Sequence, residues 1–287
     1  RSVFKVRGSD RVDSTIFMSF ATARRIAWRW LTDEMITHPG YPWTIQFPHA
    51  IAATGSFRRS FSEEDWAALP VWHKIIGAYF CHGYGASILR DALVGTAPSL
   101  IAHPTVPSFY ALGWVLTYFS PHDIVYRITQ RSRHPLRLLM IFGETVDATT
   151  TILGSFEKAK RLHPAASPFS PYACAFLVTM GGSMVRYVER RGRGWTVKAE
   201  WTKPTGLIQK GVAYIVAYGL LRRRFGVDFA RLWVTLVTCA IALWGEIADD
   251  PEFNPAAWAV DAVNAQISRL ARALHLGPSL PCKTKES

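Results

Sequence analysis

The chain has 287 residues, of which 49% are hydrophobic and 19% charged, and its formal net charge is +12. This apolar content suits a large soluble core or a membrane protein with polar ends. The basic residues form short clusters between apolar stretches, which favours contact with anionic lipid and argues against nucleic acid as a partner. The four cysteines show no CxxC spacing, which excludes the usual sequence signals of a zinc site or a disulfide scaffold.

Residues 1–38 form a basic N-terminal arm. Within it, Phe20 to Leu31 is rich in arginine and tryptophan, a composition typical of an amphipathic helix at a membrane surface or of a partner-binding arm.

Seven apolar segments follow within residues 39–248, the predicted transmembrane domain. Charges gather at the segment ends, as contact with lipid headgroups requires, and do not follow one stripe of each helix as in a soluble bundle. We therefore predict an all-α polytopic membrane protein. Its seven transmembrane helices are expected at Tyr41–Phe57, Pro70–Val94, Ile101–Thr129, Pro135–Phe156, Pro171–Tyr187, Pro204–Leu221 and Phe229–Ile247.

A six-residue pattern occurs twice, as Gly85-Ala-Ser-Ile-Leu-Arg90 in the second segment and Gly181-Gly-Ser-Met-Val-Arg186 in the fifth. Three crossings separate the copies, so corresponding helices would run in opposite directions through the bilayer. The pattern predicts two inverted three-helix repeats followed by a seventh helix.

Inverted repeats place their functional site at the midplane, on helices interrupted by glycine. The alternative is that these small residues only allow close contact between helices. The predicted pore or hinge residues of the two copies are Gly83, Gly85, Ser87, Gly181, Gly182 and Ser183.

The fourth segment carries two acids, Glu144 and Asp147, which the i, i+3 spacing places on one helix face together with neighbouring hydroxyls such as Thr145. Acids inside a membrane segment indicate a functional site, and a pore lined by them would favour cations. The alternative is a structural role in which the two acids pair with Arg90, Lys74 or Arg186.

Two further acids, Asp91 and Asp123, are expected in structural ion pairs. Asp91 is adjacent to Arg90, but the two side chains project in different directions, so we expect each of them to pair with another residue. Asp123 and Arg127, at i, i+4, are expected to pair on one helix face. The sequence has no HExxH, Gly-x-Ser-x-Gly or P-loop pattern, so we predict that the protein is not an enzyme and holds no metal.

Several motifs resemble those of the trimeric intracellular cation (TRIC) channel family. Gly83-Tyr-Gly-Ala-Ser-Ile-Leu-Arg-Asp91 is similar to its glycine-rich Gly-Gly-Gly-x-x-Arg-Asp signature, and Tyr118 to Arg127 to the stretch that closes its third helix. Leu136 to Met140, Ile152-Leu-Gly154 and Gly181-Gly-Ser183 resemble parts of its fourth and fifth helices. The likeness covers roughly His49 to Leu221.

The resemblance implies a seven-helix protomer of two inverted repeats, a homotrimer, and a potassium pore within each protomer. It also implies an endoplasmic or sarcoplasmic reticulum membrane, although the arginine-rich arm leaves the mitochondrial inner membrane open. In animal members of the family the pore carries a Lys-Glu-Val motif and a bound phosphoinositide.

The chain departs from the family at this motif, where Glu144-Thr-Val146 occupies the Lys-Glu-Val position and Ala148 replaces a basic residue. The arginine among the fifth-helix glycines is also missing. A phosphoinositide site there is therefore doubtful, because lipid headgroups need positive charge; membrane phospholipid remains the expected lipid partner. These changes, with the added tails, motivate an alternative function as a non-conducting, TRIC-derived structural subunit of a larger membrane complex.

Residues 249–287 form the last predicted region. Ala256, Val260, Val263, Ile267, Leu270 and Leu274 recur at helical spacing, which predicts an amphipathic helix over 254–276 followed by a tail.

Overall fold

The structure is a computed structural model that describes residues 42–102, 105–195 and 206–250, with isolated positions between 253 and 269. Every regular element of this part is a helix, which confirms the all-α prediction. The predicted N-terminal arm and nearly all of the predicted C-terminal helix and tail lie outside the described residues.

The first three predicted segments are broken into shorter helices. A π-helical turn, Pro42–Gln46, leads into α2 (Phe47–Arg59), and α3 (Glu63–Ala68) starts at Ser62, whose hydroxyl accepts from the backbone N–H of Asp65. The second segment consists of α4 (Val71–Ile76), the π-helical η3 (Gly77–Tyr84) and α5 (Gly85–Leu93). The third consists of α6 (Ser99–Ala102), α7 (Thr105–Phe119), the short turn η4 (Pro121–Asp123) and α8 (Ile124–Thr129).

The later segments form long, continuous helices. A proline stands at the start of both α9 and α10, where its missing N–H costs no helical hydrogen bond. Gly226, with a φ of 89°, reverses the chain between the last two helices. The four helices are α9 (Pro135–Leu162), α10 (Ser170–Gly192), α11 (Gly206–Phe225) and α12 (Val227–Ile247).

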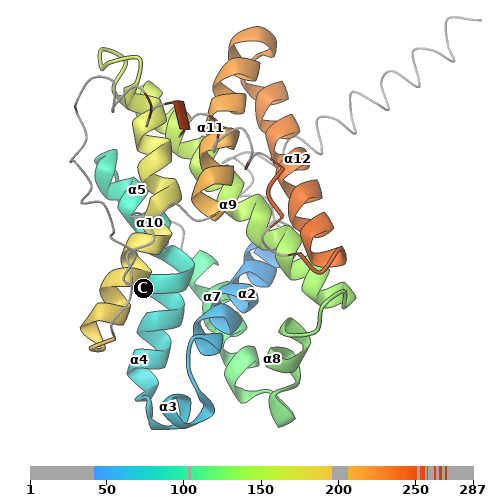
Figure 1. The fold of residues 1–287 in the computed structure, drawn as a ribbon. Coiled ribbons are helices and arrows are strands. Elements are labelled where there is room, and N and C mark those ends of the chain that lie inside the picture. Colours follow the sequence, from blue (N-terminus) through green and yellow to red (C-terminus); the bar gives the residue numbers. More distant parts are fainter. Residues whose placement is uncertain are drawn as a thin grey trace, which may run out of the picture.

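Helix α9 is the centre of the packing. It contacts α2, α10, α11 and α12, and α10 in turn packs against α5 (Figure 1). The helices alternate in direction: α4, α5, α9 and α11 run from the end that carries α3 and α8 toward the end that carries the α11–α12 turn, and α2, α7, α10 and α12 run back. Consequently α2 and α9 cross antiparallel, and so do α5 and α10.

The packed core of the second half of the chain is built from α9, α10, α11 and α12. Phe156 and Tyr218 meet edge to face, with ring centroids 5.4 Å apart, and Leu153 beside them is fully buried. Tyr172 places its ring against both Phe156 and the backbone of Gly219. This tight packing fixes the position of α9 relative to its neighbours.

Helix α12 combines the length and apolar composition that a membrane crossing requires, with a mean hydropathy of 1.6 over its most apolar window, and 28% of that window is buried. It is the one helix of the described residues that meets both criteria. Large apolar side chains are nevertheless exposed on other helices, among them Trp72, Val188 and Leu220.

The predicted pair of Asp123 and Arg127 is wrong. The backbone of His122 and Asp123 turns into the left-handed region, with φ of 52° and 57°, so Asp123 precedes α8 and does not share its face with Arg127. Its carboxylate instead accepts two hydrogen bonds from Arg58 at the end of α2, both at 2.9 Å.

Candidate functional site: a polar cavity between the helices

A cavity of about 290 Å³ lies where α2, η3, α5, α9, α10, α11 and α12 converge. Side chains far apart in the sequence meet there, from His49 to Ala242. Most predicted pore residues line it, namely Gly83, Ser87, Glu144, Thr145, Asp147, Gly182 and Ser183.

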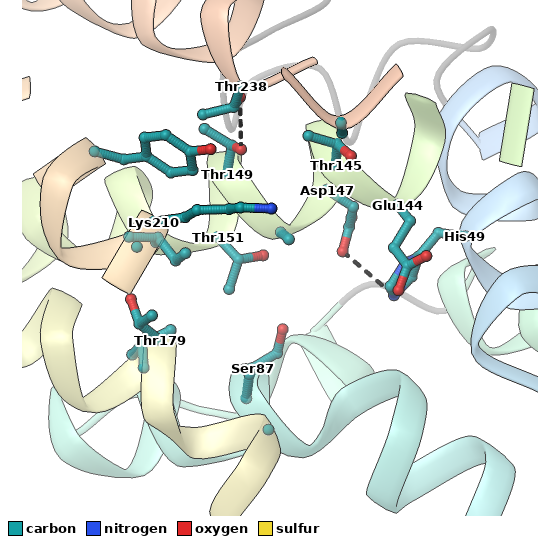
Figure 2. A pocket seen from close by; sticks show the side chains of 18 of the residues that line it. His49, Ser87, Glu144, Thr145, Asp147, Thr149, Thr151, Thr179, Lys210 and Thr238 are labelled. Carbon is teal, nitrogen blue, oxygen red and sulfur yellow. Dashed lines mark hydrogen bonds and ion pairs between the residues drawn. The ribbon is translucent and has the colours of Figure 1, made fainter. Parts of the chain in front are cut away.

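Helix α9 supplies the acidic end of the cavity. Glu144 and Asp147 both line it, as their i, i+3 spacing predicts, and lie close to His49 in Figure 2. The nearest oxygen of Asp147 is 3.6 Å from Nε2 of His49, which projects from the buried face of α2. Glu144 is exposed and Asp147 is partly buried, so this end of the cavity reaches the surface of the chain.

Hydroxyl groups continue from the acids along α9. Thr145, Thr149 and Thr151 line the cavity, and Thr149 hydrogen-bonds Thr238 of α12 over 3.1 Å (Figure 2). Thr238 also donates to the backbone carbonyl of Thr235, which holds its hydroxyl in place. These oxygens give the wall a row of groups that can coordinate water or a cation.

The opposite wall comes from the two copies of the repeated pattern. Ser87 lies on α5, across the cavity from the α9 acids in Figure 2, and Gly182 and Ser183 lie on α10. Arg186 donates to the Ser183 hydroxyl at 3.3 Å and lines the cavity as well. The predicted structural arginine therefore also contributes positive charge to the candidate site.

Sequence reasoning missed Lys210 of α11, whose side chain extends into the cavity in Figure 2. Lys210 is a charged residue within the predicted sixth segment, so the rule that singled out Glu144 and Asp147 applied to it equally. His82 of η3 and Tyr214 of α11 were missed too; the same rule covers a histidine in the second segment, whereas a tyrosine carries no comparable signal.

Gly85 and Gly181 do not line the cavity; they form the contact between α5 and α10. A Cβ atom placed on Gly85 would lie 3.0 Å from Cβ of Val185, and one on Gly181 would lie 2.8 Å from Cδ2 of Leu89. The first residue of each six-residue copy thus packs on the fifth residue of the other copy. Here the close-contact alternative describes the glycines better than a hinge does.

The predicted interruption is present in one copy. The π-helical η3 ends at Tyr84, and the α-helix resumes at Gly85. The other glycine pair, Gly181 and Gly182, lies inside the continuous α10, so the prediction of a break there is wrong. Close packing against Leu89 keeps the glycine side of α10 covered without a break in its backbone.

The expectation that Arg90 and Asp91 do not pair is also wrong. Nε of Arg90 donates to Oδ1 of Asp91 at 2.8 Å, and Nζ of Lys158 reaches the same oxygen at 3.1 Å. Asp91 is fully buried, and a buried carboxylate requires compensating charge. The flexible arginine side chain folds back at the end of α5 to supply it, and α5 is tied to α9 through Lys158.

Comparison with solved structures identifies the fold. The chain matches a structure described as the basis for activity of TRIC counter-ion channels in calcium release, with a TM-score of 0.64 and 18% identity over 75% of this chain and 97% of that one. It also matches a trimeric intracellular cation channel from C. elegans without Ca²⁺, with a TM-score of 0.59 and 19% identity over the same shares. No protein-family model and no curated protein matches the sequence.

The chain has the fold of the TRIC channels. The resemblance drawn from its motifs is confirmed at this level, over nearly the whole length of both channels. Both structural neighbours are described as ion channels, which fits the prediction of a protein that is not an enzyme.

Proposed function

We propose that this protein is a channel for monovalent cations, with one pore in each protomer running through the cavity that Glu144 and Asp147 line. The observation that carries the proposal is a pair of carboxylates, one exposed and one partly buried, at a cavity between helices arranged as in TRIC channels. Carboxylates attract cations and repel anions at a pore entrance, and hydroxyl oxygens replace part of the ion's hydration shell.

Cations would enter at the acidic end, pass the row of threonines and meet Lys210 deeper in the cavity. Lys210 and Arg186 balance the formal charge of the two acids. The preference for cations therefore depends on the position of the acids at the entrance, apart from the basic groups further along the path. In this arrangement the ammonium group of Lys210 is the electrostatic barrier that limits conduction.

Two observations support an inverted repeat of three plus three helices. The first is the reciprocal packing of Gly85 on Val185 and of Gly181 on Leu89, because a two-fold relation makes each contact occur in both directions. The second is the opposite direction of corresponding helices, α2 with α9 and α5 with α10.

A second short duplication supports the same relation. Gly-Ser-Phe occurs at residues 55–57 of α2 and again at 154–156 of α9. The next residue, Arg58 in one helix and Glu157 in the other, forms an ion pair with the end of the third helix of its half. Arg58 pairs with Asp123 after α7, and Glu157 pairs with Arg222 of α11 at 2.6 Å. The position after Gly-Ser-Phe thus carries a positive charge in the first helix and a negative charge in the second, and the charge of its partner is opposite in each case.

We further propose a homotrimer in an intracellular membrane with potassium as the main ion. The trimer and the membrane rest on the description of one neighbour as a trimeric intracellular cation channel, whereas potassium rests on the resemblance of the motifs to the TRIC family. Sedimentation or native mass measurement in mild detergent tests the oligomer, and localisation of the tagged chain tests the membrane.

The decisive experiment measures current through purified protein in planar bilayers under a potassium chloride gradient. We expect a reversal potential close to that of potassium, and a shift toward zero in the variant Glu144→Gln/Asp147→Asn. Glu64→Gln is the matched control, because Glu64 is an exposed acid of α3 outside the cavity.

Each negative result has its own meaning. Bilayers that stay silent with correctly folded wild-type protein would overturn the channel proposal and favour the alternative of a structural subunit. An equal preference for cations in wild type and in the double variant would support a cation channel but show that Glu144 and Asp147 do not determine its selectivity.

A further inference from the structure

We propose that the apolar groove between α11 and α12 is a binding site for one acyl chain of an anionic phospholipid, whose phosphate is held by Arg224. The inference rests on the membrane setting of the proposed function, but it concerns a site outside the ion path and a ligand of different chemistry.

The groove has a volume of about 300 Å³ and an almost wholly apolar lining. Its residues come from both helices and include three large aromatic rings, Phe225, Phe229 and Trp233. These rings are 38% to 56% exposed in the chain. The remaining lining residues are Tyr214, Ala217, Leu221, Val234 and Val237.

The length of the groove fits one leaflet of a bilayer. The eleven-residue advance from Tyr214 to Phe225 along α11 corresponds to about 16 Å of helix. The hydrocarbon core of a bilayer is about 30 Å thick, so the groove spans about half of it. A single acyl chain of one leaflet therefore matches the groove in length and in polarity.

Charge complementarity selects the headgroup. Arg224 stands at the end of α11 next to Phe225 and is exposed, whereas Arg223 lies on the face of the helix opposite the groove lining. Arg222 is already engaged by Glu157, through bonds of 2.6 and 3.2 Å. Arginine binds phosphate oxygens through two parallel hydrogen bonds, so a phosphate above the groove would meet the guanidinium group of Arg224.

The test is native mass spectrometry of the full chain, purified in detergent and mixed with phosphatidylglycerol or phosphatidylcholine carrying identical acyl chains. We expect wild-type protein to retain phosphatidylglycerol preferentially. Arg224→Gln should lower that retention about fivefold and leave phosphatidylcholine almost unchanged. Arg223→Gln is the matched control, because Arg223 is an equally exposed arginine on the opposite face of α11.

The groove itself is tested by a filling substitution. Val237→Trp places a large ring in the groove and should lower retention of both lipids, whereas Leu236→Trp, one residue away and outside the lining, should not. The two positions are similarly exposed, at 46% and 49%, so both variants are expected to fold.

Three outcomes would overturn the site. Equal retention of the two lipids by wild type would show that the headgroup is not recognised. Unchanged retention in Val237→Trp would show that the acyl chain does not lie in the groove. Displacement of phosphatidylglycerol by inorganic phosphate alone would show an anion site that needs no acyl chain. Recovery of the protein from cells without detergent would instead defeat the membrane setting, so the two failures are distinguishable.

Discussion

Arg58 and Asp123 form a two-pronged ion pair, with Nη1–Oδ1 and Nη2–Oδ2 distances of 2.9 Å, that joins the end of α2 to the turn after α7. The guanidinium of Arg58 is buried and also lies over the ring of Tyr126 at 4.1 Å. This pair closes the first half of the molecule in the same way as Glu157 and Arg222 close the second.

Replacing Asp123 with asparagine removes the main counter-charge of the buried Arg58 guanidinium and should destabilise the protein. Because the carboxylate of Asp123 is partly exposed to solvent, which weakens the pair, the expected loss is about 1–3 kcal/mol. The hydrogen bonds from Arg58 lower the pKa of Asp123 below its ordinary value. The stabilisation is therefore complete above about pH 4, the pKa of an unfolded aspartate, and is lost as the pH falls through the lowered pKa.

Thermal unfolding in detergent at several pH values checks this prediction. Wild type should lose stability relative to Asp123→Asn toward pH 3, so that the two curves converge. A constant difference between the two proteins down to pH 3 would show that Asp123 contributes nothing through its charge.

The α5–α10 contact predicts that Gly85→Ala destabilises the protein by about 1–3 kcal/mol, because the added methyl would meet three carbons of the branched Val185 side chain within 3.2 Å. Val185→Ala in the same protein should restore part of the loss. Gly182→Ala is the matched control, since its new methyl would meet only the flexible end of Arg186. The melting temperatures of wild type, the two Gly85→Ala proteins and Gly182→Ala test this prediction. A control as unstable as Gly85→Ala would count against the close contact.

Asp91→Asn is expected to cost about 3–5 kcal/mol, because it leaves Arg90 and Lys158 without the fully buried carboxylate that they share. Lys158→Gln should cost less, since Arg90 still compensates Asp91 and the lysine side chain is 24% exposed. The yield of folded protein and its melting temperature measure both. Equal losses would indicate that Lys158 carries most of the compensation.

Neutralising Lys210 is expected to increase potassium current and cation preference, because the barrier in the proposed path loses its charge. Lys210→Gln should raise single-channel conductance about two- to tenfold, if the barrier falls by about 0.4–1.4 kcal/mol. Lys160→Gln, an exposed lysine on α9, is the control. Unchanged conductance in Lys210→Gln would place the ion path elsewhere.

The helices and part of the cavity lining follow from local sequence patterns. The apolar segments define the helices, and the i, i+3 spacing of Glu144 and Asp147 fixes their common face. The glycines divide in a way that sequence does not specify: Gly83 and Gly182 line the cavity, whereas Gly85 and Gly181 fill a helix contact. Spacing says which residues share a face, but which neighbour covers that face depends on tertiary packing.

The ion pairs show the same limit. The i, i+4 rule for Asp123 and Arg127 assumes a continuous helix, and the left-handed backbone of His122 and Asp123 breaks it. The partner of Asp123 lies 65 positions away in the sequence. Lys210 differs from these cases, because an isolated charge in an apolar segment is visible in the sequence itself.

Tyr214 lines both the polar cavity and the apolar groove. In the proposed channel, the ring of this residue would lie between the ion path and the bound acyl chain. A molecule that fills the outer face of this ring and a solute that occupies the inner face would share one wall, so their binding free energies would be linked reciprocally. The composition of the surrounding bilayer would then influence the rate of ion passage.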